Sequence, residues 1–398
     1  MVEEGKKEEK GVFKELYSTF FAKSWEMWIG SIILAFLSIC LLLIAAPWGS
    51  SGGIVNWGQN LFSGIGLPLT NSAPNGVTWI FEHKYALLSI SVIIGALASA
   101  LLGKEFAVRT APGGELFKGL FGGILMGIGC ILAFGCTVGN FFSGWAAFSG
   151  GALIFVLGLV IGVYFAVRYL LWEMEKHPKM SSGKSSTFLQ AKTKGTSLQP
   201  LAGIIILIIG FVLAYTFKDF TLLAFTAIGL IIGFVLQRSR WCIVRALREP
   251  FMTGDAEPAL AIIAGLIVGI IGFTIIQFKG ISQITIPTNF WMPAIIGGII
   301  FGFGMTIAGG CTVGSSWRAG EGHVKLWLAL IGIIFAGPLT AEYIRPGFMN
   351  ILPSWMKQDV FLPTYFSYLG ALVIMFLILL IWFIFVKWNE KTGRFSAM

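Results

Sequence analysis

Two of the five cysteines in this chain stand in the same pentapeptide, GCTVG, at residues 135–139 and 310–314. A cysteine thiol offers a weak S–H donor to an anion, and its thiolate is a nucleophile. Each of the two cysteines is preceded by a glycine and followed by a threonine, whose hydroxyl adds a hydrogen-bond donor. The candidate binding residues of the two motifs are therefore Gly135, Cys136, Thr137, Gly310, Cys311 and Thr312.

A third cysteine lies in a basic segment, LQRSRWCIVRALREPFMTGD, at residues 236–255. Guanidinium groups near Cys242 would favour its thiolate and attract anions, so Cys242 and Arg245 join the candidate binding residues. Arg245 and Arg248 are three residues apart and share a helical face, and Glu249 is spaced to pair with Arg245. The arginines also have a second explanation, because positive residues gather on the cytoplasmic side of membrane proteins.

Other features of the sequence argue against several kinds of catalytic centre. Cys40 and Cys130 fall inside apolar stretches, where a lone cysteine usually acts as a small hydrophobic residue. The sequence contains no CxxC motif and no Cys/His metal spacing, so we expect no metal ion and no other cofactor. Of the three histidines, only His323 lies near a GCTVG motif, twelve residues after Cys311, which argues against a Cys–His hydrolase.

The composition is that of a membrane protein, because 56% of the 398 residues are hydrophobic and only 12% are charged. Soluble domains carry about 25% charged residues, and apolar runs of about 18 or more residues are typical of membrane-spanning helices. We therefore predict an all-α polytopic membrane protein with ten spanning helices. The predicted spans are 27–46, 85–103, 117–135, 151–171, 200–216, 219–237, 256–277, 290–309, 325–344 and 365–386.

The distribution of positive charge predicts how the chain is oriented in the membrane. If the N-terminus is cytoplasmic, the inner segments hold 23 of the 28 lysines and arginines, and the outer segments hold 5. We therefore expect a multi-pass protein of the inner (plasma) membrane with both termini in the cytoplasm. Residues 1–26 do not have the pattern of a signal peptide, so the first span is expected to be retained. The net charge of +9 then reflects topology, and we expect no nucleic acid partner.

A polar stretch at 174–199, rich in serine and lysine, predicts a cytoplasmic linker between two halves of the chain. It follows a cytoplasmic N-terminal segment (1–26) and a first half (27–173) that contains the first GCTVG motif. A second half (200–387) contains the second motif and is followed by a cytoplasmic tail (388–398).

The two halves share an internal repeat at an offset of 175 residues. GGILMGIGCILAFGCTVG (122–139) and GGIIFGFGMTIAGGCTVG (297–314) are identical at eleven of eighteen positions. The number of predicted spans implies that the span before the first motif runs outward and the span before the second runs inward. We therefore predict two inverted-topology repeats, an arrangement in which transporters bind substrate near the membrane midplane. A weaker similarity pairs GKEFAVR (103–109) with QRSRWCIVR (237–245), which sets Phe106 opposite Cys242.

The character of the sequence changes after each repeated cysteine. CTVGNFFSGWAAFSG and CTVGSSWRAGEGHV are rich in glycine and serine and are too short to cross a membrane. Irregular backbone at membrane depth is tolerated only against protein or a water-filled cavity. We therefore predict short re-entrant helices that direct their N-termini at a bound anion, with ordinary loops as the alternative. The glycines before each cysteine, spaced by four, allow helices to pack closely.

The glycine ladder ending in GCTVG in both halves, the QRSRWC segment and GGCTVGSSWRAGEGHV resemble the YeeE/YedE family of membrane sulfur-compound transporters. The length, the linker and the order of motifs are most similar to its longer YedE-type branch, which is associated with selenium metabolism. The resemblance covers roughly residues 85–385. It implies a central path with Cys136 and Cys311 as central thiols and Cys242 as the third. It also implies a small cytoplasmic sulfur-carrier protein as a partner.

Three functions are compatible with these features. The first is a transporter that imports thiosulfate or a related sulfur or selenium compound through a path lined by cysteines. The second is a membrane-embedded thiol enzyme that relays sulfane sulfur to a cytoplasmic carrier, and the third is a scaffold for a soluble sulfurtransferase. The sequence contains no nucleotide-binding motif, metal signature or hydrolase triad, so we favour the transporter.

Overall fold

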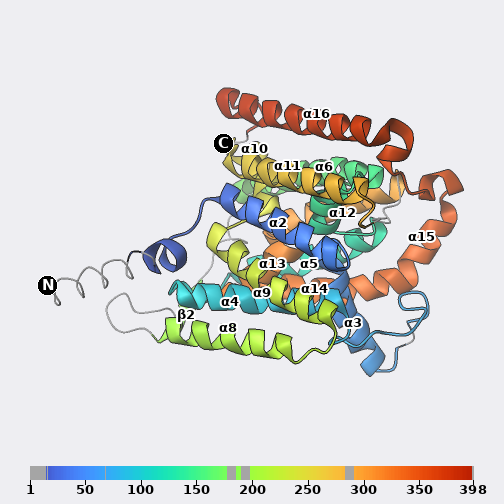
Figure 1. The fold of residues 1–398 in the computed structure, drawn as a ribbon. Coiled ribbons are helices and arrows are strands. Elements are labelled where there is room, and N and C mark those ends of the chain that lie inside the picture. Colours follow the sequence, from blue (N-terminus) through green and yellow to red (C-terminus); the bar gives the residue numbers. More distant parts are fainter. Residues whose placement is uncertain are drawn as a thin grey trace.

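The structure, a computed structural model, describes residues 15, 17–67, 69–176, 185–189, 198–282 and 291–396. Much of the predicted N-terminal segment and of the predicted linker lies outside the described residues. The described chain is built almost entirely of helices (Figure 1). Two short strands, β1 (Val108–Thr110) and β2 (Ser186–Phe188), pair antiparallel, so part of the linker is tied to the first half.

The predicted spanning helices are present. Nine helices within the described residues are long and apolar enough to cross a membrane, and the tenth predicted span is a 17-residue apolar helix. This confirms the all-α polytopic fold class. The ten helices are α2 (Met27–Ile44), α4 (Lys84–Leu102), α5 (Gly113–Leu132), α6 (Gly150–Lys176), α8 (Gln199–Tyr215), α9 (Phe220–Ser239), α11 (Glu257–Phe278), α12 (Met292–Ala308), α14 (Val324–Leu339) and α16 (Leu362–Thr392).

Short helices connect the spanning ones. Two of them, η2 (Thr137–Gly144) and α13 (Thr312–Glu321), begin directly after the repeated cysteines, so the alternative of ordinary loops is wrong for both. Two others, α3 and α10, begin near the centre and were not expected from the sequence. The remaining short helices, with these two, are η1 (Ser18–Ala22), α3 (Ser51–Gly64), α10 (Ile243–Met252), η3 (Thr340–Ile344), α15 (Arg345–Ile351) and η4 (Ser354–Lys357).

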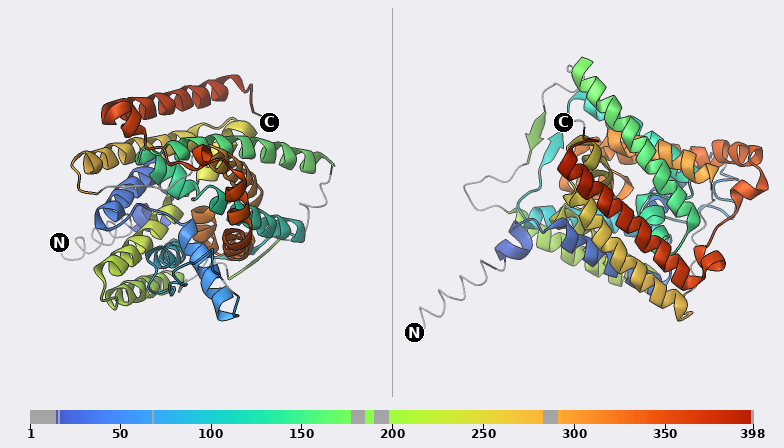
Figure 2. Two further views of the ribbon diagram at one scale, coloured as in Figure 1. Left: turned by 90° about the vertical axis from the view of Figure 1, so that its right-hand side faces the viewer. Right: turned by 90° about the horizontal axis from the view of Figure 1, so that it is seen from above.

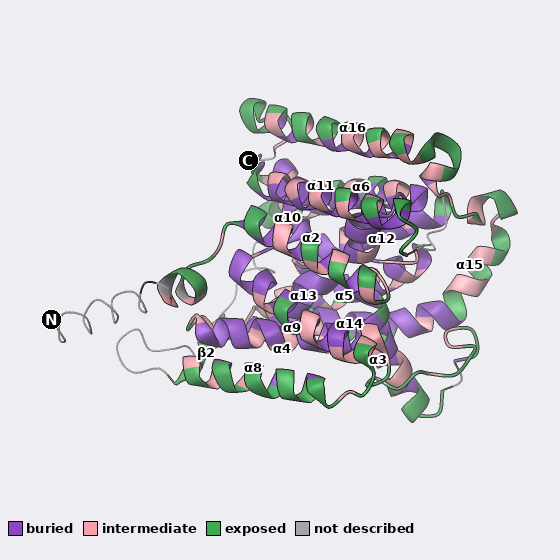
Figure 3. Ribbon diagram, viewed as in Figure 1, coloured by how far each residue is buried: buried purple, intermediate pink, exposed green. Residues whose placement is uncertain are grey.

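The bundle has two ends, which we name by the chain segments that lie there. At the terminal face, on the left of Figure 1, α2 begins and α16 ends. At the distal face, on the right, lie the end of α3 and the short helix α15. The view from above in Figure 2 shows α16 lying across one side of the bundle. Figure 3 shows that α8 and α16 are largely exposed, whereas the helices between them are largely buried. Exposed apolar side chains such as Leu369, which is 77% exposed, suit a surface that faces lipid.

The helices that precede the two GCTVG motifs pack against each other through glycines. A Cβ on Gly122 of α5 would lie 2.5 Å from the Gly304 carbonyl oxygen of α12, and one on Gly129 would lie 2.6 Å from that of Gly297. These contacts require the absence of side chains, which lets two backbones approach closely in a membrane. Since later residues of α5 meet earlier residues of α12, the two helices run antiparallel. Moreover, Gly297 and Gly304 are the counterparts of Gly122 and Gly129, 175 residues further along the chain. Each glycine of the first copy therefore contacts the counterpart of the other glycine in the second copy.

The neighbouring helices pack in pairs that are also equivalent between the two copies. Helix α5 packs on α14 while α12 packs on α6, and α4 packs on α9 while α2 packs on α11. The order α2, α3, α4, α5, η2, α6 thus corresponds to α9, α10, α11, α12, α13, α14. In this order α10, which begins after Cys242, corresponds to α3, which begins after Ser50. The weaker sequence similarity that set Phe106 opposite Cys242 is therefore wrong, because Phe106 lies between α4 and β1, where no helix begins.

Candidate functional site

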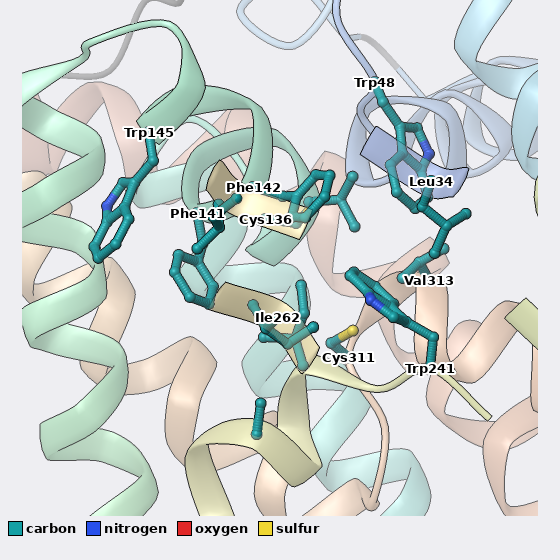
Figure 4. Close-up of a cluster of buried hydrophobic side chains, with 14 of the residues drawn as sticks. Leu34, Trp48, Cys136, Phe141, Phe142, Trp145, Trp241, Ile262, Cys311 and Val313 are labelled. Carbon is teal, nitrogen blue, oxygen red and sulfur yellow. The ribbon is translucent and has the colours of Figure 1, made fainter. Parts of the chain in front are cut away.

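Four short helices begin close to the buried centre of the bundle, and three of them begin at a cysteine. The residues that directly precede α3, η2, α10 and α13 are Ser50, Cys136, Cys242 and Cys311. Ser50 is 4% exposed and each of the three cysteines is at most 1% exposed. The first turns of a helix carry unsatisfied N–H groups and a partial positive charge. These helix starts thus supply positive potential to a region of apolar side chains, part of which is drawn in Figure 4.

The glycine before each repeated cysteine makes room for the turn into the short helix. A Cβ on Gly135 would lie 2.1 Å from Asn140 Oδ1, and one on Gly310 would lie 3.1 Å from Ser315 Oγ. Asn140 Nδ2 donates to the Ala133 carbonyl at 2.9 Å, which holds the end of α5 against η2. Gly310 and Ser315 occupy the same positions of the second copy, so both copies place a polar side chain against the glycine.

The threonine of each motif lies beside the thiol of the other motif. Thr312 neighbours Cys136, and Thr137 neighbours Cys311. Both threonine side chains are fully buried, and the thiol of the other motif is the hydrogen-bonding group beside each hydroxyl. Neither hydroxyl makes a hydrogen bond of regular geometry among the described residues. Cys311 also lies within electrostatic range of Cys242 and Cys136. Sulfur is a weak hydrogen-bond partner, so each threonine hydroxyl can exchange it for a polar ligand between the thiols.

Aromatic side chains enclose the thiols. The ring centroids of Trp48 and Trp241 are 6.0 Å apart, and Phe142 lies 5.6 Å from Trp241 (Figure 4). Ser143 Oγ of η2 donates to the Trp48 carbonyl at 2.8 Å, and Trp317 Nε1 of α13 donates to the Trp241 carbonyl at 3.1 Å. Each short helix that follows a GCTVG motif is thereby tied to the segment that begins another short helix.

A cavity of about 470 Å³ leads from the distal face toward this centre. We call it the distal vestibule. Its wall includes Gly135 and Gly139, and a Cβ on Gly139 would have no atom within 4 Å. The wall also includes Trp48, whose buried Nε1 has no partner among the described residues. A half-buried arginine, Arg345, lies in the wall with its guanidinium carbon 3.9 Å from the ring centroid of Phe134. Among the described residues of its wall, the vestibule therefore combines one cation, Arg345, with an unpartnered side-chain donor, Trp48 Nε1.

Phe134 holds an unusual backbone conformation at this position. Its φ is 58°, in the left-handed region, where a residue with a side chain costs roughly 1–2 kcal/mol. The second copy has Gly309 at the same position, with φ 82°. The first copy therefore keeps a strained aromatic residue where a glycine would suffice, and that aromatic ring supports Arg345.

Ion pairs cover the terminal side of the thiols. Arg240 joins Glu321 at 2.6 Å and Glu105 at 2.8 Å, and Arg238 joins Glu105 at 2.5 Å. Arg240 caps the end of α9 with φ 53° and lies two residues before Cys242.

Most of the predicted binding residues are brought together, but Arg245 is not. Both GCTVG motifs and Cys242 meet at the centre. Among the described residues, no hydrogen bond or ion pair joins the half-buried Arg245 to a cysteine. The partner expected for Arg245 was also wrong, because Glu249 pairs with its neighbour Arg248 at 2.6 Å. Arg245 lies in the first turn of α10.

Sequence reasoning missed Trp48 and Cys130. Cys130 lines the distal vestibule and neighbours Cys136. Cys40, by contrast, is exposed on the surface of α2. A faint signal for Trp48 was present, since Trp48 lies three residues before the start of α3 and Trp241 lies two residues before the start of α10. A single shared residue, at positions that differ by one, is too little to be recognised as a repeat.

Known proteins are similar to this chain over most of its length. A family model described as "Sulphur transport" matches residues 3–165 and 238–397. The probable transporter YedE of Escherichia coli strain K12 is 27% identical over 361 residues, which cover 88% of each chain. The probable transporter YedE of Salmonella typhimurium is 29% identical over 320 residues, which cover 78% of each chain.

Shorter matches involve proteins whose substrate is named. The thiosulfate transporter TsuA of Escherichia coli strain K12 is 36% identical over 103 residues, which are 26% of this chain and 29% of that protein. The thiosulfate transporter TsuA of Spirochaeta thermophila is 33% identical over 131 residues, which are 33% of this chain and 38% of that protein. Because the family model matches most of its length, the chain belongs to the sulphur transport family and is a multi-pass membrane transporter of sulfur compounds rather than an enzyme.

Proposed function

We propose that this protein imports thiosulfate or a closely related sulfur oxyanion along a path from the distal vestibule, past the buried thiols, to the terminal face. The observation that carries the proposal is the meeting of three helix starts, each preceded by a cysteine, with two buried threonine hydroxyls that lie beside the thiols. The similarity to proteins named thiosulfate transporters supports the choice of substrate.

The chemistry of the centre suits passage better than tight binding. Helix starts replace part of the water around an anion with N–H groups and partial charges, and thiols add weak S–H donors. Conduction requires sites that bind strongly enough to admit an ion and weakly enough to release it. A cage of arginines around the thiols would hold a dianion, whereas the charged side chains here lie at the two ends of the path.

The positions of the thiols suggest the order in which an ion meets them. Cys136 directly follows Gly135, which lines the distal vestibule, so it comes first. Cys242 lies two residues from Arg240 at the terminal side, so it comes last. Cys311 neighbours both of the other thiols and stands between them.

The two halves act as inverted-topology repeats in this proposal, and the terminal face is cytoplasmic. The antiparallel packing of α5 on α12 and the exchanged glycine contacts support the first point. The 23 of 28 lysines and arginines predicted on that side support the second, together with an inner-membrane location. A small sulfur-carrier protein would then dock on the basic terminal face, and a selenium analogue of the substrate would meet the same donors.

Uptake of labelled thiosulfate by proteoliposomes tests the function. Wild-type protein should transport thiosulfate, and Cys40→Ser, which changes an exposed thiol on α2, should transport it equally well. Cys136→Ser with Cys311→Ser should lose most of the uptake. Full uptake by that double variant would refute a path that depends on the thiols, and no uptake by the wild type would refute the substrate. Persulfides that form on Cys242 during turnover would indicate covalent relay instead.

A further inference from the structure

A buried carboxylate surrounded by cations lies on the terminal side of the thiols. Glu321 is the last residue of α13, and its side chain is 1% exposed. Arg240 Nη1 lies 2.6 Å from Glu321 Oε1 and 2.8 Å from Oε2. Arg109 Nη1 lies 3.6 Å from the same carboxylate, and His323 Nδ1 lies 3.7 Å from it. A carboxylate at the negative end of a helix is unfavourable, so the guanidinium groups of Arg240 and Arg109 must stabilise it.

Positive charges outnumber negative ones around this carboxylate. Glu105 accepts from both Arg238 and Arg240, which leaves Arg240 shared between two carboxylates. Arg318 donates to the Gly309 carbonyl at 2.6 Å and lies over the Trp317 ring, and among the described residues no carboxylate pairs with it. We call these six charged residues the terminal cluster: Glu105, Arg109, Arg238, Arg240, Arg318 and Glu321. Within this cluster, four arginines against two carboxylates leave two positive charges in excess.

The terminal cluster lies between the last thiol and the solvent. The guanidinium of Arg240 lies 5.9 Å from the ring of Trp317, whose Nε1 donates to the carbonyl of Trp241, next to Cys242. Cys242 is 1% exposed, whereas the side chains of Arg240 and Arg109 are 37% and 33% exposed. An ion that leaves Cys242 toward the terminal face therefore meets these arginines next.

We propose that the terminal cluster is a second oxyanion-binding site, in which the Glu321 carboxylate occupies the place that thiosulfate or sulfate takes in passing. This rests on the proposed function, since it receives the ion that leaves Cys242. Arginine binds carboxylates and tetrahedral oxyanions with the same planar set of donors, so one can replace the other. Arg240 and Arg109 bind the arriving ion, and Glu321 returns to them as it departs.

The physical role of Glu321 is that of a tethered competitor. Guanidinium groups without a counter-ion would hold a dianion for a long time, because charge-assisted hydrogen bonds are strong. A carboxylate attached to the same protein has a high effective concentration, so it shortens the time for which the ion is bound. Glu105 and Arg238 keep Arg240 in position while Glu321 moves.

Equilibrium binding tests the proposal without requiring transport. Labelled thiosulfate and labelled sulfate are bound to purified full-length protein in detergent, in a Cys136→Ser and Cys311→Ser background that removes the central thiols. Glu321→Gln should tighten binding about fivefold or more at low salt, because the competing charge is lost. Arg109→Gln, a change at a partly exposed side chain, should weaken it by about the same factor. Lys279→Gln removes a positive charge at the exposed end of α11 and should leave both values unchanged.

The outcomes are separable from those of the proposed function. A Glu321→Gln protein that elutes like its parent in gel filtration but binds no more tightly overturns the terminal site. If that variant does not fold, unchanged binding by Arg109→Gln overturns it instead. Failure of the wild type to take up thiosulfate refutes the proposed function only, because the binding of sulfate and thiosulfate to the terminal cluster is measured independently.

Discussion

Replacing Gly135 by alanine tests whether the first GCTVG motif is built around a close contact. A Cβ at this position would lie 2.1 Å from Asn140 Oδ1 and 2.6 Å from its Cγ. Asn140 cannot swing away freely, because its Nδ2 donates to the Ala133 carbonyl at 2.9 Å and the residue is 1% exposed. Gly139 is a matched control within the same motif, since a Cβ there would have nothing within 4 Å.

The expected loss of stability follows from these contacts. Overpacking a buried site costs about 1–3 kcal/mol, and a lost buried hydrogen bond costs about 1 kcal/mol more. Alanine recovers about 0.4–1 kcal/mol by restricting the unfolded chain. Gly135→Ala should therefore lower the free energy of unfolding by about 1–3 kcal/mol. The free energy of unfolding of Gly139→Ala should stay within about 1 kcal/mol of the wild-type value, because the substitution changes only the conformational entropy of the unfolded chain.

Thermal unfolding of the purified protein in detergent measures the difference between the two variants. The midpoint should fall for Gly135→Ala and should be unchanged or slightly raised for Gly139→Ala. Thiosulfate uptake supplies a second readout, because the new methyl group of Gly139→Ala projects into the distal vestibule and should reduce uptake without loss of stability. Equal midpoints for wild type and Gly135→Ala, or equal losses in both variants, would refute the reasoning.

Other contacts lead to three further expectations. Burial lowers the pKa of His83, which caps α4 by accepting the Ala86 N–H on Nδ1, so the unfolded chain binds the proton first as pH falls. Stability should drop as pH falls through about 6.5, and His83→Asn should reduce this dependence in thermal unfolding; burial also lowers the pKa of His323, which contributes the remainder. Gly122→Ala places a Cβ 2.5 Å from a backbone oxygen of α12 and should cost about 1–3 kcal/mol, whereas Gly113→Ala, with nothing within 4 Å, should not. Arg345→Gln should raise the KM for thiosulfate about threefold to tenfold at low salt and less at high salt, and an unchanged KM would contradict a role in attracting the anion.

The spanning helices could be predicted because their signal is local. A run of apolar residues long enough to cross a membrane is visible without knowing its neighbours, and each of the ten predicted runs corresponds to a helix. The ends were less certain, as α6 continues to Lys176 and α16 to Thr392, beyond the predicted spans. A helix can continue with polar residues beyond the hydrocarbon region of the membrane, so the end of an apolar run does not mark the end of the helix.

The short helices were only half predictable. The starts of η2 and α13 follow a repeated motif, so the sequence drew attention to both. The starts of α3 and α10 share only a nearby tryptophan, and the weaker sequence similarity paired Cys242 with the wrong segment. Their correspondence became clear only through packing, since α3 and α10 hold equivalent places among the surrounding helices.

By itself, the sequence determined that this protein lies in a membrane, which segments span it and which residues repeat. Helices that contact lipid need long apolar runs, and a duplicated segment keeps identical residues at equivalent positions. Only the tertiary structure decided that the Thr312 hydroxyl neighbours Cys136 and that Arg240 joins Glu105 to Glu321. Such contacts depend on how α5 and α12 cross, and a crossing is set by backbone contact between glycines far apart in the chain. No local pattern of residues encodes which glycine meets which carbonyl.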